Sequence, residues 1–291
     1  MKKIAVIGVP GGWSSERLAD ELERKTGFRC LVDLENVAMD LENNKVFNGV
    51  AELSDMDALI IKKAGPAYSP KLLDRLEMLR FLKAGGVRIF SDPLSIIRVL
   101  DRVSCTVTLT AGGIPMPPTA VTENVDLALD FVAKYGKAVF KPLYSTKARG
   151  MIVVEDGPHA REQVTDYHSE HSVMYLQKMV EHPGKDMGVA FLGGEYLATY
   201  ARVGDGQSWN TTTRSGGKYE PYEPSDEIKE LAYKAQALFD LDFTCVDVVE
   251  TPEGPKVFEV SAFGGFRGLL DANQIDAAAM YADYVLQRIT P

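Results

Sequence analysis

The stretch FTCVDVVETPEGPKVFEVS, residues 243–261, contains two apolar segments joined by a turn. We predict a β-hairpin here, because Thr-Pro-Glu-Gly-Pro suits a turn and interrupts strand pairing. Asp247 and Glu259 lie within the two strands, and Ser261 follows Glu259 on the same strand face. Isolated carboxylates in apolar strands are costly unless they are paired or bind a cation. The residues therefore indicate either a hard oxygen site suited to Mg²⁺ or ion pairs with lysine or arginine at a sheet edge.

Two earlier segments carry polar residues at the ends of expected strands. Lys141 closes the apolar segment Ala-Val-Phe-Lys and precedes a polar loop that returns through Arg149. A lysine beside such a loop can hold a polyphosphate, although a lysine at a strand end can also simply extend its ammonium into water. Gln177 lies in a second apolar strand, and Asp186 follows in a turn. This second segment fits either a nucleoside-binding edge or an ordinary turn.

The first part of the chain, up to residue 92, alternates strand and helix patterns. We expect parallel βαβ packing there and a hairpin within residues 36–53. The expected strands are 4–9, 28–34, 58–61 and 87–90, and the expected helices are 14–25 and 70–84.

The remainder of the chain favours antiparallel hairpins with covering helices. We expect one or two helices over 93–109, an extended proline-rich connector at 114–119, and a closing helix over 269–289. The further expected elements are helices at 124–135 and 225–239 and strands at 138–143, 151–154, 174–180, 188–192 and 196–202. The fold class is therefore mixed, α/β followed by α+β, and the expected domains are 1–92, 93–172 and 173–291.

Composition excludes several classes of protein. Among 291 residues, 41 acidic and 32 basic side chains give a net charge of −9, which disfavours a nucleic-acid partner. Three cysteines with no CxxC pair indicate a reducing compartment, and no apolar run suggests a membrane span, so we expect a cytoplasmic protein. A homo-oligomer is compatible with the sequence. The four histidines share one window; His168 and His171 fit either a metal pair or a solvated helix end.

Taken in order, these motifs resemble the ATP-grasp superfamily and, within it, the RimK-like carboxylate–amine ligases, which include glutamate ligases. The resemblance runs from about residue 92 to residue 268, over half of the chain. It rests on the following segments: Asp101-Arg102, Gly113-Ile-Pro-Met-Pro-Pro-Thr119, Phe140-Lys-Pro-Leu143, Arg149-Gly150, Gln177, Lys185-Asp186, Gly194-Glu195, Arg202, Trp209 with Gly216-Gly217, Val246-Asp247 and Glu259-x-Ser261.

The resemblance implies an ATP-grasp fold with a Rossmann-like N-terminal domain and two α+β subdomains that clamp ATP. It implies Mg²⁺, with Mn²⁺ as an alternative, on Asp247, Glu259 and Ser261, where Ser261 replaces the usual asparagine. Arg202 and Lys141 are the implied catalytic residues. The implied nucleotide-binding residues are Arg102 (in place of the usual lysine), Lys141, Gln177, the backbone at Lys178 and Met179, and Asp186 near the ribose.

The implied reaction is ATP-dependent ligation. The γ-phosphoryl group would pass to a carboxylate of an amino acid or peptide, and an amine would then displace phosphate from the acylphosphate. The alternatives are a phosphotransferase that stops after the first step and a non-catalytic nucleotide-binding regulatory module. Ser14, with its neighbours Trp13 and Ser15, is a candidate for the substrate site. Arg267 is another, although it could instead form an internal salt bridge.

Overall fold

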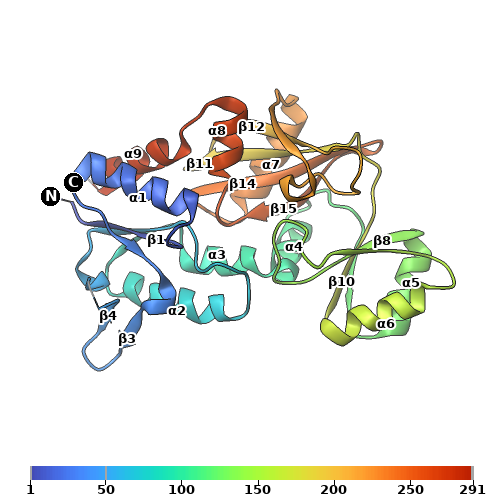
Figure 1. Cartoon of the computed structure of the whole chain (residues 1–291), viewed down its shortest axis with the longest axis horizontal. Helices are drawn as coiled ribbons and strands as arrows, with labels where there is room; N and C mark the ends of the chain where they lie inside the picture. The colour runs from blue at the N-terminus through green and yellow to red at the C-terminus, as the bar shows by residue number, and fades with distance from the viewer. Residues whose placement is uncertain (1, 50, 290–291) are drawn as a thin grey trace.

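The computed structural model describes residues 2–49 and 51–289 of the chain (Figure 1). An N-terminal sheet, a middle sheet and a large C-terminal sheet, each with its helices, succeed one another along the chain. Among the described residues, no helix combines the length and hydropathy that a bilayer crossing demands. All three cysteines are free thiols.

The N-terminal sheet is parallel, as the alternation of strands and helices predicted, and its strand order is β2-β1-β5-β6. Alternate residues of β1 face opposite layers: Ile4 and Val6 pack against helices α1 and α9, whereas Ala5 and Ile7 join the core beneath α2. The predicted hairpin between residues 36 and 53 is present as β3–β4. The elements are β1 (Ile4–Ile7), α1 (Trp13–Thr26), β2 (Leu31–Val32), β3 (Ala38–Asp40), β4 (Lys45–Phe47), β5 (Ala58–Ile61), α2 (Lys71–Ala84) and β6 (Arg88–Phe90).

Two helices, rather than one, link this sheet to the middle sheet. They are α3 (Pro93–Leu100) and α4 (Arg102–Ala111). The break falls at Asp101, whose extended backbone ends α3 and whose side chain accepts a hydrogen bond of 2.7 Å from the Ser104 N–H. The aspartate therefore caps α4 and fixes the direction of the residue that follows it, Arg102.

The middle sheet is antiparallel with the order β7-β10-β8-β9. Its elements are β7 (Thr119–Thr122), α5 (Val125–Tyr135), β8 (Lys137–Lys141), β9 (Ile152–Glu155), α6 (Ala160–Glu170) and β10 (Met174–Lys178). The predicted boundary after residue 172 puts β10 in the third domain. Instead it pairs with β7 and β8 and completes the middle sheet, because its apolar side chains fill the core under α5 and α6. We therefore propose that the middle domain extends to residue 178.

The C-terminal sheet is antiparallel with the order β13-β12-β11-β14-β15. Its elements are β11 (Lys185–Leu192), β12 (Glu195–Val203), β13 (Lys218–Pro221), α7 (Asp226–Ala237), β14 (Phe243–Thr251), β15 (Gly254–Ser261), α8 (Phe266–Asn273) and α9 (Ala277–Ile289). Short 3-10 turns occupy Leu34–Asn36, Leu53–Asp55 and Thr213–Ser215. The single closing helix we expected is wrong: Gln274 is left-handed at φ 58° and ends α8, and α9 then begins at Ala277.

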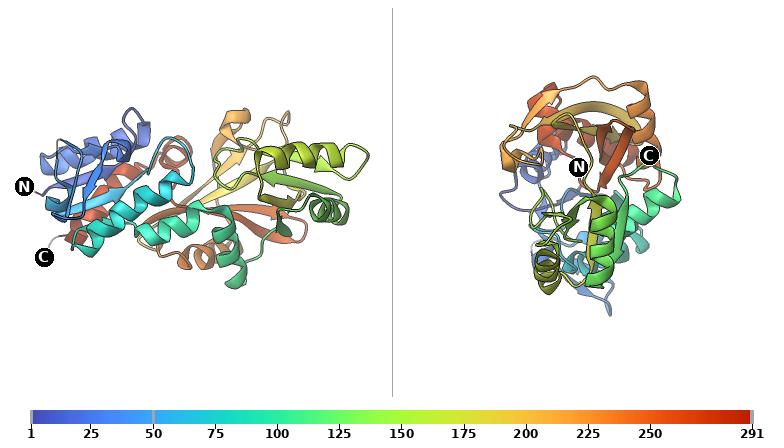
Figure 2. Two further views of the ribbon diagram at one scale, coloured as in Figure 1. Left: turned by 90° about the horizontal axis from the view of Figure 1, so that it is seen from below. Right: turned by 90° about the vertical axis from the view of Figure 1, so that its right-hand side faces the viewer.

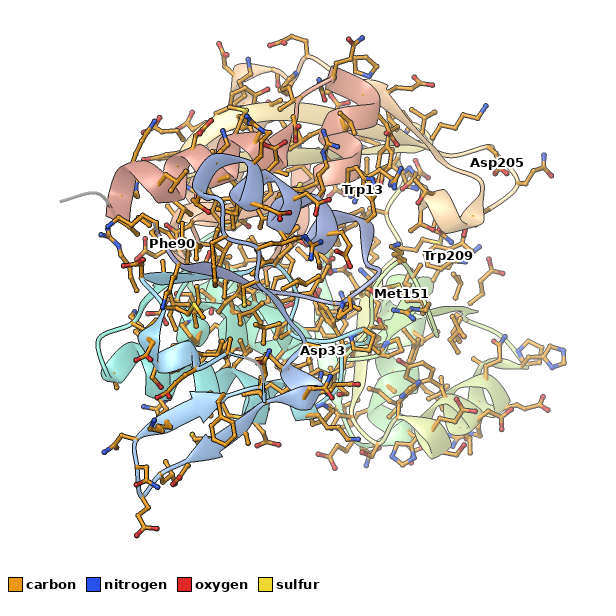
Figure 3. All side chains as sticks on the ribbon, turned by 60° about the vertical axis from the view of Figure 1, so that its left-hand side comes forward. Trp13, Asp33, Phe90, Met151, Asp205 and Trp209 are labelled. Atoms are coloured by element: carbon orange, nitrogen blue, oxygen red, sulfur yellow. The ribbon has the colours of Figure 1, made fainter. Side chains whose placement is uncertain are left out.

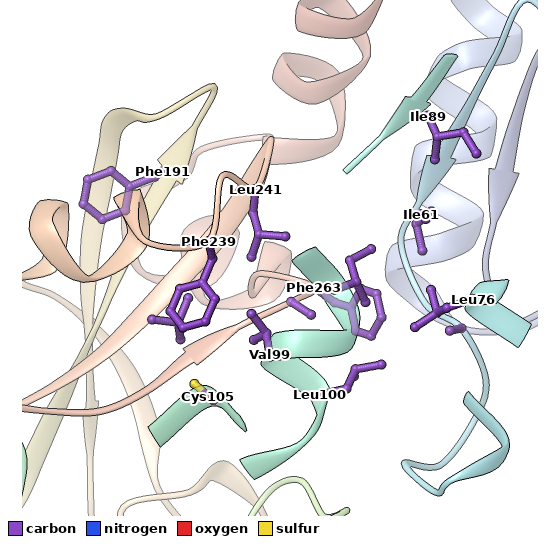
Figure 4. Close-up of a cluster of buried hydrophobic side chains, with 14 of the residues drawn as sticks. Ile61, Leu76, Ile89, Val99, Leu100, Cys105, Phe191, Phe239, Leu241 and Phe263 are labelled. Atoms are coloured by element: carbon purple, nitrogen blue, oxygen red, sulfur yellow. The ribbon is translucent and has the colours of Figure 1, made fainter. Parts of the chain in front are cut away.

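The N-terminal and C-terminal sheets share their hydrophobic cores, whereas the middle sheet has its own. Figure 4 shows Ile61 and Ile89 of the first sheet on one side of helix α3, which carries Val99, and Phe239 on the other side. Helix α9 returns to lie beside α1, and both described ends of the chain lie at the same end of the elongated molecule (Figure 2). The middle unit is therefore the part with the least apolar attachment to the rest.

Candidate active site

A cleft with a volume of about 320 Å³ lies between the middle and C-terminal sheets, with residues of the N-terminal unit at one side. Figure 3 labels Met151, just before β9 of the middle unit, and Trp209, in the loop after β12 of the C-terminal unit; both residues line the cleft. The charged lining residues are Lys63, Arg102, Lys141, Lys147, Lys178, Asp186, Arg202, Asp247 and Glu259. Apart from the candidates at residues 13–15, Arg267 and the two histidines, every site residue we predicted lines this cleft.

Arg202 joins two acidic residues on neighbouring strands of the C-terminal sheet. Its register partner on β11 is Asp186, and its Nε donates to Asp186 Oδ2 at 3.0 Å. Its Nη2 lies 2.9 Å from Asp247 Oδ2 on β14 and also pairs with Asp186. Burial raises the pKa of the Asp247 carboxyl, while the Arg202 charge opposes that rise. The sequence left open that Asp247 pairs with a lysine or arginine at a sheet edge. Such an ion pair does form, with Arg202, and it lies within the cleft.

Arg102 holds the second carboxylate of the predicted metal site. Asp247 and Glu259 are opposite each other in the β14–β15 register. Arg102 Nη1 lies 2.9 Å from Glu259 Oε2, and its other nitrogens donate to the carbonyls of Pro142 at 3.2 Å and Ser145 at 3.4 Å. Its side chain is 8% exposed. Arg102 thus connects the hairpin to the loop after β8, and all three of its nitrogens are engaged within the protein.

Lys141 ends β8 and points into the cleft from the middle sheet. Its Nζ donates to Gln177 Oε1 at 2.6 Å and lies 5.1 Å from the centre of the Phe258 ring. Gln177 in turn donates to Thr119 Oγ1 at 3.0 Å. Burial, followed by the positive charge of Arg102, lowers the pKa of Lys141 to about 7. Gln177 therefore positions the lysine, and Lys141 has no carboxylate partner among the described residues.

The predicted nucleoside contacts are partly engaged by the protein itself. The backbone N–H of Lys178 donates to Pro118 O at 2.8 Å, and that of Met179 donates to Lys137 O at 2.9 Å. These two N–H groups are therefore not available to a base edge, and any contact from this pair must come from its carbonyl oxygens. Asp186 is 5% exposed, and both of its carboxylate oxygens bind protein groups.

The donor set fits a magnesium ion. No cluster of three or more histidine, cysteine or acidic side chains that could hold a metal occurs in residues 2–49 and 51–289. Mg²⁺ commonly binds through only one or two carboxylates, together with substrate phosphates and water. Asp247, Glu259 and the Ser261 hydroxyl offer this smaller set of hard oxygen ligands on adjacent strands. His168 and His171 belong to no such cluster in the described chain, and His171 packs on Tyr167.

The remaining candidates lie on the N-terminal side. Ser15 is buried, and its hydroxyl accepts the Val9 N–H at 3.1 Å, so it stabilises the loop after β1. Arg267 stacks over the Trp13 ring at 4.2 Å, and no acidic partner for it is seen in the described part of the chain. The salt bridge we kept as an alternative is therefore not formed, and roles for Ser14 and Arg267 in substrate binding stay predictions.

Sequence reasoning missed two adjacent lysines, Lys62 and Lys63, directly after β5. Lys62 is 2% exposed, and its Nζ donates to the carbonyls of Phe263 at 2.5 Å and Gly264 at 2.8 Å. It therefore ties the N-terminal sheet to the segment that follows the metal hairpin. Lys63 lines the cleft. The available signal was a charged pair at the end of a wholly apolar strand, the edge at which parallel sheets bind ligands.

Comparisons with known proteins give a family match and a relative that aligns over nearly the whole chain. A model of the RimK-like ATP-grasp domain matches residues 99–285. Tetrahydromethanopterin:alpha-L-glutamate ligase of Methanosarcina acetivorans is 26% identical, over 98% of this chain and 99% of the relative.

Two solved structures share the fold. The ATP-grasp ligase PsnB, complexed with a phosphomimetic variant of its minimal precursor, Mg and ADP, has a TM-score of 0.77 at 16% identity, covering 99% of each chain. A RimK domain ATP-grasp protein from Sphaerobacter thermophilus has a TM-score of 0.74 at 20% identity, covering 97% of this chain and 99% of that one.

Proposed function

The chain belongs to the RimK-like ATP-grasp family of ATP-dependent ligases, and from that premise we propose that it joins a carboxylate to an amine through an acylphosphate. The motif series predicted the RimK-like ATP-grasp family, the ATP-grasp fold and the ligase class. The family match and the solved structures confirm all three. The individual roles of the cleft residues are proposals.

One observation supports this function above the others. Two cation systems face each other across the cleft: Lys141 held by Gln177 on the middle sheet, and Arg202 between two carboxylates on the C-terminal sheet. Phosphoryl transfer depends on positioned charge rather than on a side-chain nucleophile, so this arrangement supplies what the first step needs. This arrangement requires no histidine.

The residues have different roles in the two steps of the proposed reaction. A substrate carboxylate oxygen attacks the γ-phosphorus of ATP, and ADP leaves with the bridging oxygen. Lys141 neutralises phosphate charge, and Arg202 stabilises the oxygen that gains charge during both steps. The amine nitrogen then attacks the acyl carbon, and phosphate leaves with the former carboxylate oxygen. Asp247, Glu259 and Ser261 would hold Mg²⁺, which neutralises the phosphates when bound.

The finer assignments rest on the relatives and on ligand chemistry. Several relatives are named for α-L-glutamate, so L-glutamate is the first amine substrate to test, with peptides next. We propose Mg²⁺ as the metal, and Mn²⁺ is the second ion to test because both favour oxygen ligands. We also propose that the protein acts in the cytoplasm.

The decisive experiment follows oxygen transfer. A panel of carboxylates labelled with ¹⁸O is incubated with Mg·ATP and L-glutamate, and the released phosphate is analysed by mass spectrometry. The proposal expects one labelled oxygen in phosphate, and ADP release that requires both the carboxylate and the amine. Stoichiometric formation of a stable phosphorylated product without amine would indicate a phosphotransferase. ATP binding without ADP formation on any acceptor would indicate a regulatory module.

A further inference from the structure

The two carboxylates of the predicted metal site each have one oxygen bound to an arginine. Asp247 Oδ2 lies 2.9 Å from Arg202 Nη2, and Glu259 Oε2 accepts from Arg102 Nη1 at 2.9 Å. In the part of the chain that the structure describes, no hydrogen bond reaches Asp247 Oδ1, Glu259 Oε1 or the Ser261 hydroxyl. The hairpin therefore offers a divalent ion three side-chain oxygen atoms, one from each of these residues.

This small set of oxygen atoms suits one magnesium ion rather than two. Mg²⁺ requires octahedral coordination, and it fills the positions that the protein leaves open with water and substrate phosphates. A second ion beside the first would need a further carboxylate oxygen. The remaining oxygen of Glu259 is bound by Arg102, and that of Asp247 is paired with Arg202. Arg102 therefore occupies the oxygen through which Glu259 could bind a second ion.

The position of Arg102 is fixed by more than its ion pair. Arg102 is the first residue of α4, and Asp101 caps that helix through the Ser104 N–H at 2.7 Å. The second oxygen of Asp101 accepts from the Tyr144 hydroxyl at 3.3 Å. Two carbonyls of the loop after β8 accept from Arg102 Nε and Nη2. The guanidinium is therefore held beside Glu259 by the backbone and the helix cap, and not by the carboxylate alone.

Arg102 also keeps donors for a ligand. Each Nη nitrogen of a guanidinium carries a pair of N–H groups. Nη1 of Arg102 uses one of its pair for Glu259, and Nη2 uses one for the Ser145 carbonyl. The described residues provide no acceptor for the other N–H of either nitrogen, and Arg102 lines the cleft. Guanidinium N–H groups bind phosphate oxygens well, so Arg102 can neutralise phosphate charge from this fixed position.

The charge of the cleft also matches one ion. Of the described residues that line it, six are lysine or arginine and three are acidic. Positive charge remains in excess when Lys63 and Lys141, whose pKa values are lowered by burial, are counted as neutral. ATP with one bound Mg²⁺ is still an anion, whereas ATP with two bound ions is almost neutral. A positive cleft attracts the anion, so the lining favours the nucleotide that carries a single ion.

We propose that this chain binds a single divalent ion per nucleotide, on Asp247, Glu259 and Ser261, and that the Arg102 guanidinium supplies the second positive charge at the phosphates. Sites for phosphoryl transfer that use two ions neutralise the phosphates with both metals. Here the arginine would contact the phosphates and also prevent Glu259 from binding another ion. This inference rests on the proposed ligase function and specifies the number of metal ions for it.

Electron paramagnetic resonance of Mn²⁺ tests the proposal, with the full-length chain in excess over AMPPNP. A Mn²⁺ titration gives the number of ions bound per nucleotide, and two ions that share Glu259 would couple magnetically and broaden the spectrum. Wild type should bind one ion with an unbroadened spectrum.

Arg102→Met frees Glu259 Oε2, so a second ion should bind and the spectrum should broaden. At a Mn²⁺ concentration that fills only one site, the affinity of this variant for AMPPNP should fall by about tenfold or more, because a charge-assisted contact is lost. The matched control is Arg80→Met, an exposed arginine on α2 that does not line the cleft, and it should behave as wild type.

Two magnetically coupled Mn²⁺ ions per AMPPNP in wild type would overturn the proposal. So would an Arg102→Met variant that still binds a single ion or keeps wild-type affinity for AMPPNP. Circular dichroism and urea unfolding identify a variant that fails to fold, and in that case the wild-type count decides alone. The transfer of labelled oxygen to phosphate does not depend on the number of ions, so a result with two ions would leave the ligase assignment intact.

Discussion

Replacing Lys141 by methionine should stabilise the unliganded protein while it weakens nucleotide binding. The pKa of Lys141 falls from 10.5 to about 7, first because of burial and then because of the Arg102 charge. A shift of this size corresponds to roughly 5 kcal/mol that the folded state loses when the lysine is protonated. Methionine is similar in length and carries no charge, so it removes this cost.

The sign of the pH dependence follows from linkage. The unfolded chain keeps the ordinary lysine pKa, so between about pH 7 and pH 10.5 it binds more protons than the folded chain, and stability rises with pH. The cost is complete below pH 7 and disappears near pH 10.5. The variant also loses the hydrogen bond to Gln177, worth about 1 kcal/mol. We therefore expect a gain of at most about 4 kcal/mol at pH 6 and a loss of about 1 kcal/mol near pH 10.5.

Two measurements check this prediction. Urea unfolding of the unliganded wild type and Lys141→Met variant at both pH values gives the stability difference. Calorimetry at pH 8 gives proton uptake on Mg·AMPPNP binding, from buffers with different ionisation enthalpies. Only about a tenth of Lys141 is protonated at pH 8, so bound phosphate should draw in up to about 0.9 proton more in wild type than in the variant.

The reasoning would be refuted by a variant that is less stable than wild type at pH 6. It would also be refuted by equal proton uptake in the two proteins at pH 8. Adenosine serves as the control ligand, because it lacks the phosphates. If Lys141→Met weakens adenosine and AMPPNP binding to the same extent, the lysine does not contact phosphate.

Three further predictions concern the C-terminal sheet. Glu259→Ala should abolish Mg·ATP turnover and keep the fold, as ADP release and circular dichroism will show; near-normal turnover would remove the metal assignment. Arg202→Met leaves two buried carboxylates without a guanidinium, so urea unfolding should report a loss of about 3–5 kcal/mol, and an unchanged midpoint would contradict the ion-pair account. Gly188→Ala places a Cβ 2.4 Å from the Tyr200 ring and should lower stability by about 1–3 kcal/mol, with wild-type stability as the opposing outcome.

Much of the local structure could be predicted from the sequence. The β14–β15 hairpin is present, and its register places Asp247 opposite Glu259. A hairpin pairs segments that are adjacent in sequence, so strand periodicity and turn residues largely determine which residues meet. The same local reasoning failed at residues 274–276, where no proline or glycine marked the left-handed break between α8 and α9.

Contacts between distant segments could not be predicted in this way. The strand at 174–178 carries the same apolar pattern whether it joins the middle or the C-terminal sheet, and only pairing with β7 and β8 decides between them. The sequence could not decide either whether Asp247 is a metal ligand or part of an ion pair. Its partner Arg202 lies on β12, and the position of β12 depends on the tertiary fold. The sequence also did not show that the N–H groups of Lys178 and Met179 are hydrogen-bonded, because their acceptor carbonyls lie in the proline-rich connector and in β8.

The sequence by itself determined the family, the order of the motifs and the carboxylates of the C-terminal hairpin, because these depend on residue types and short spacings. The tertiary structure alone decided that Arg102 and Arg202 neutralise those carboxylates and that Gln177 positions Lys141. It also placed Lys63 of the N-terminal unit and Lys147 of the middle unit in the lining of one cleft. The physical reason is that charge interactions act through space over a few ångströms, and sequence spacing does not encode that distance.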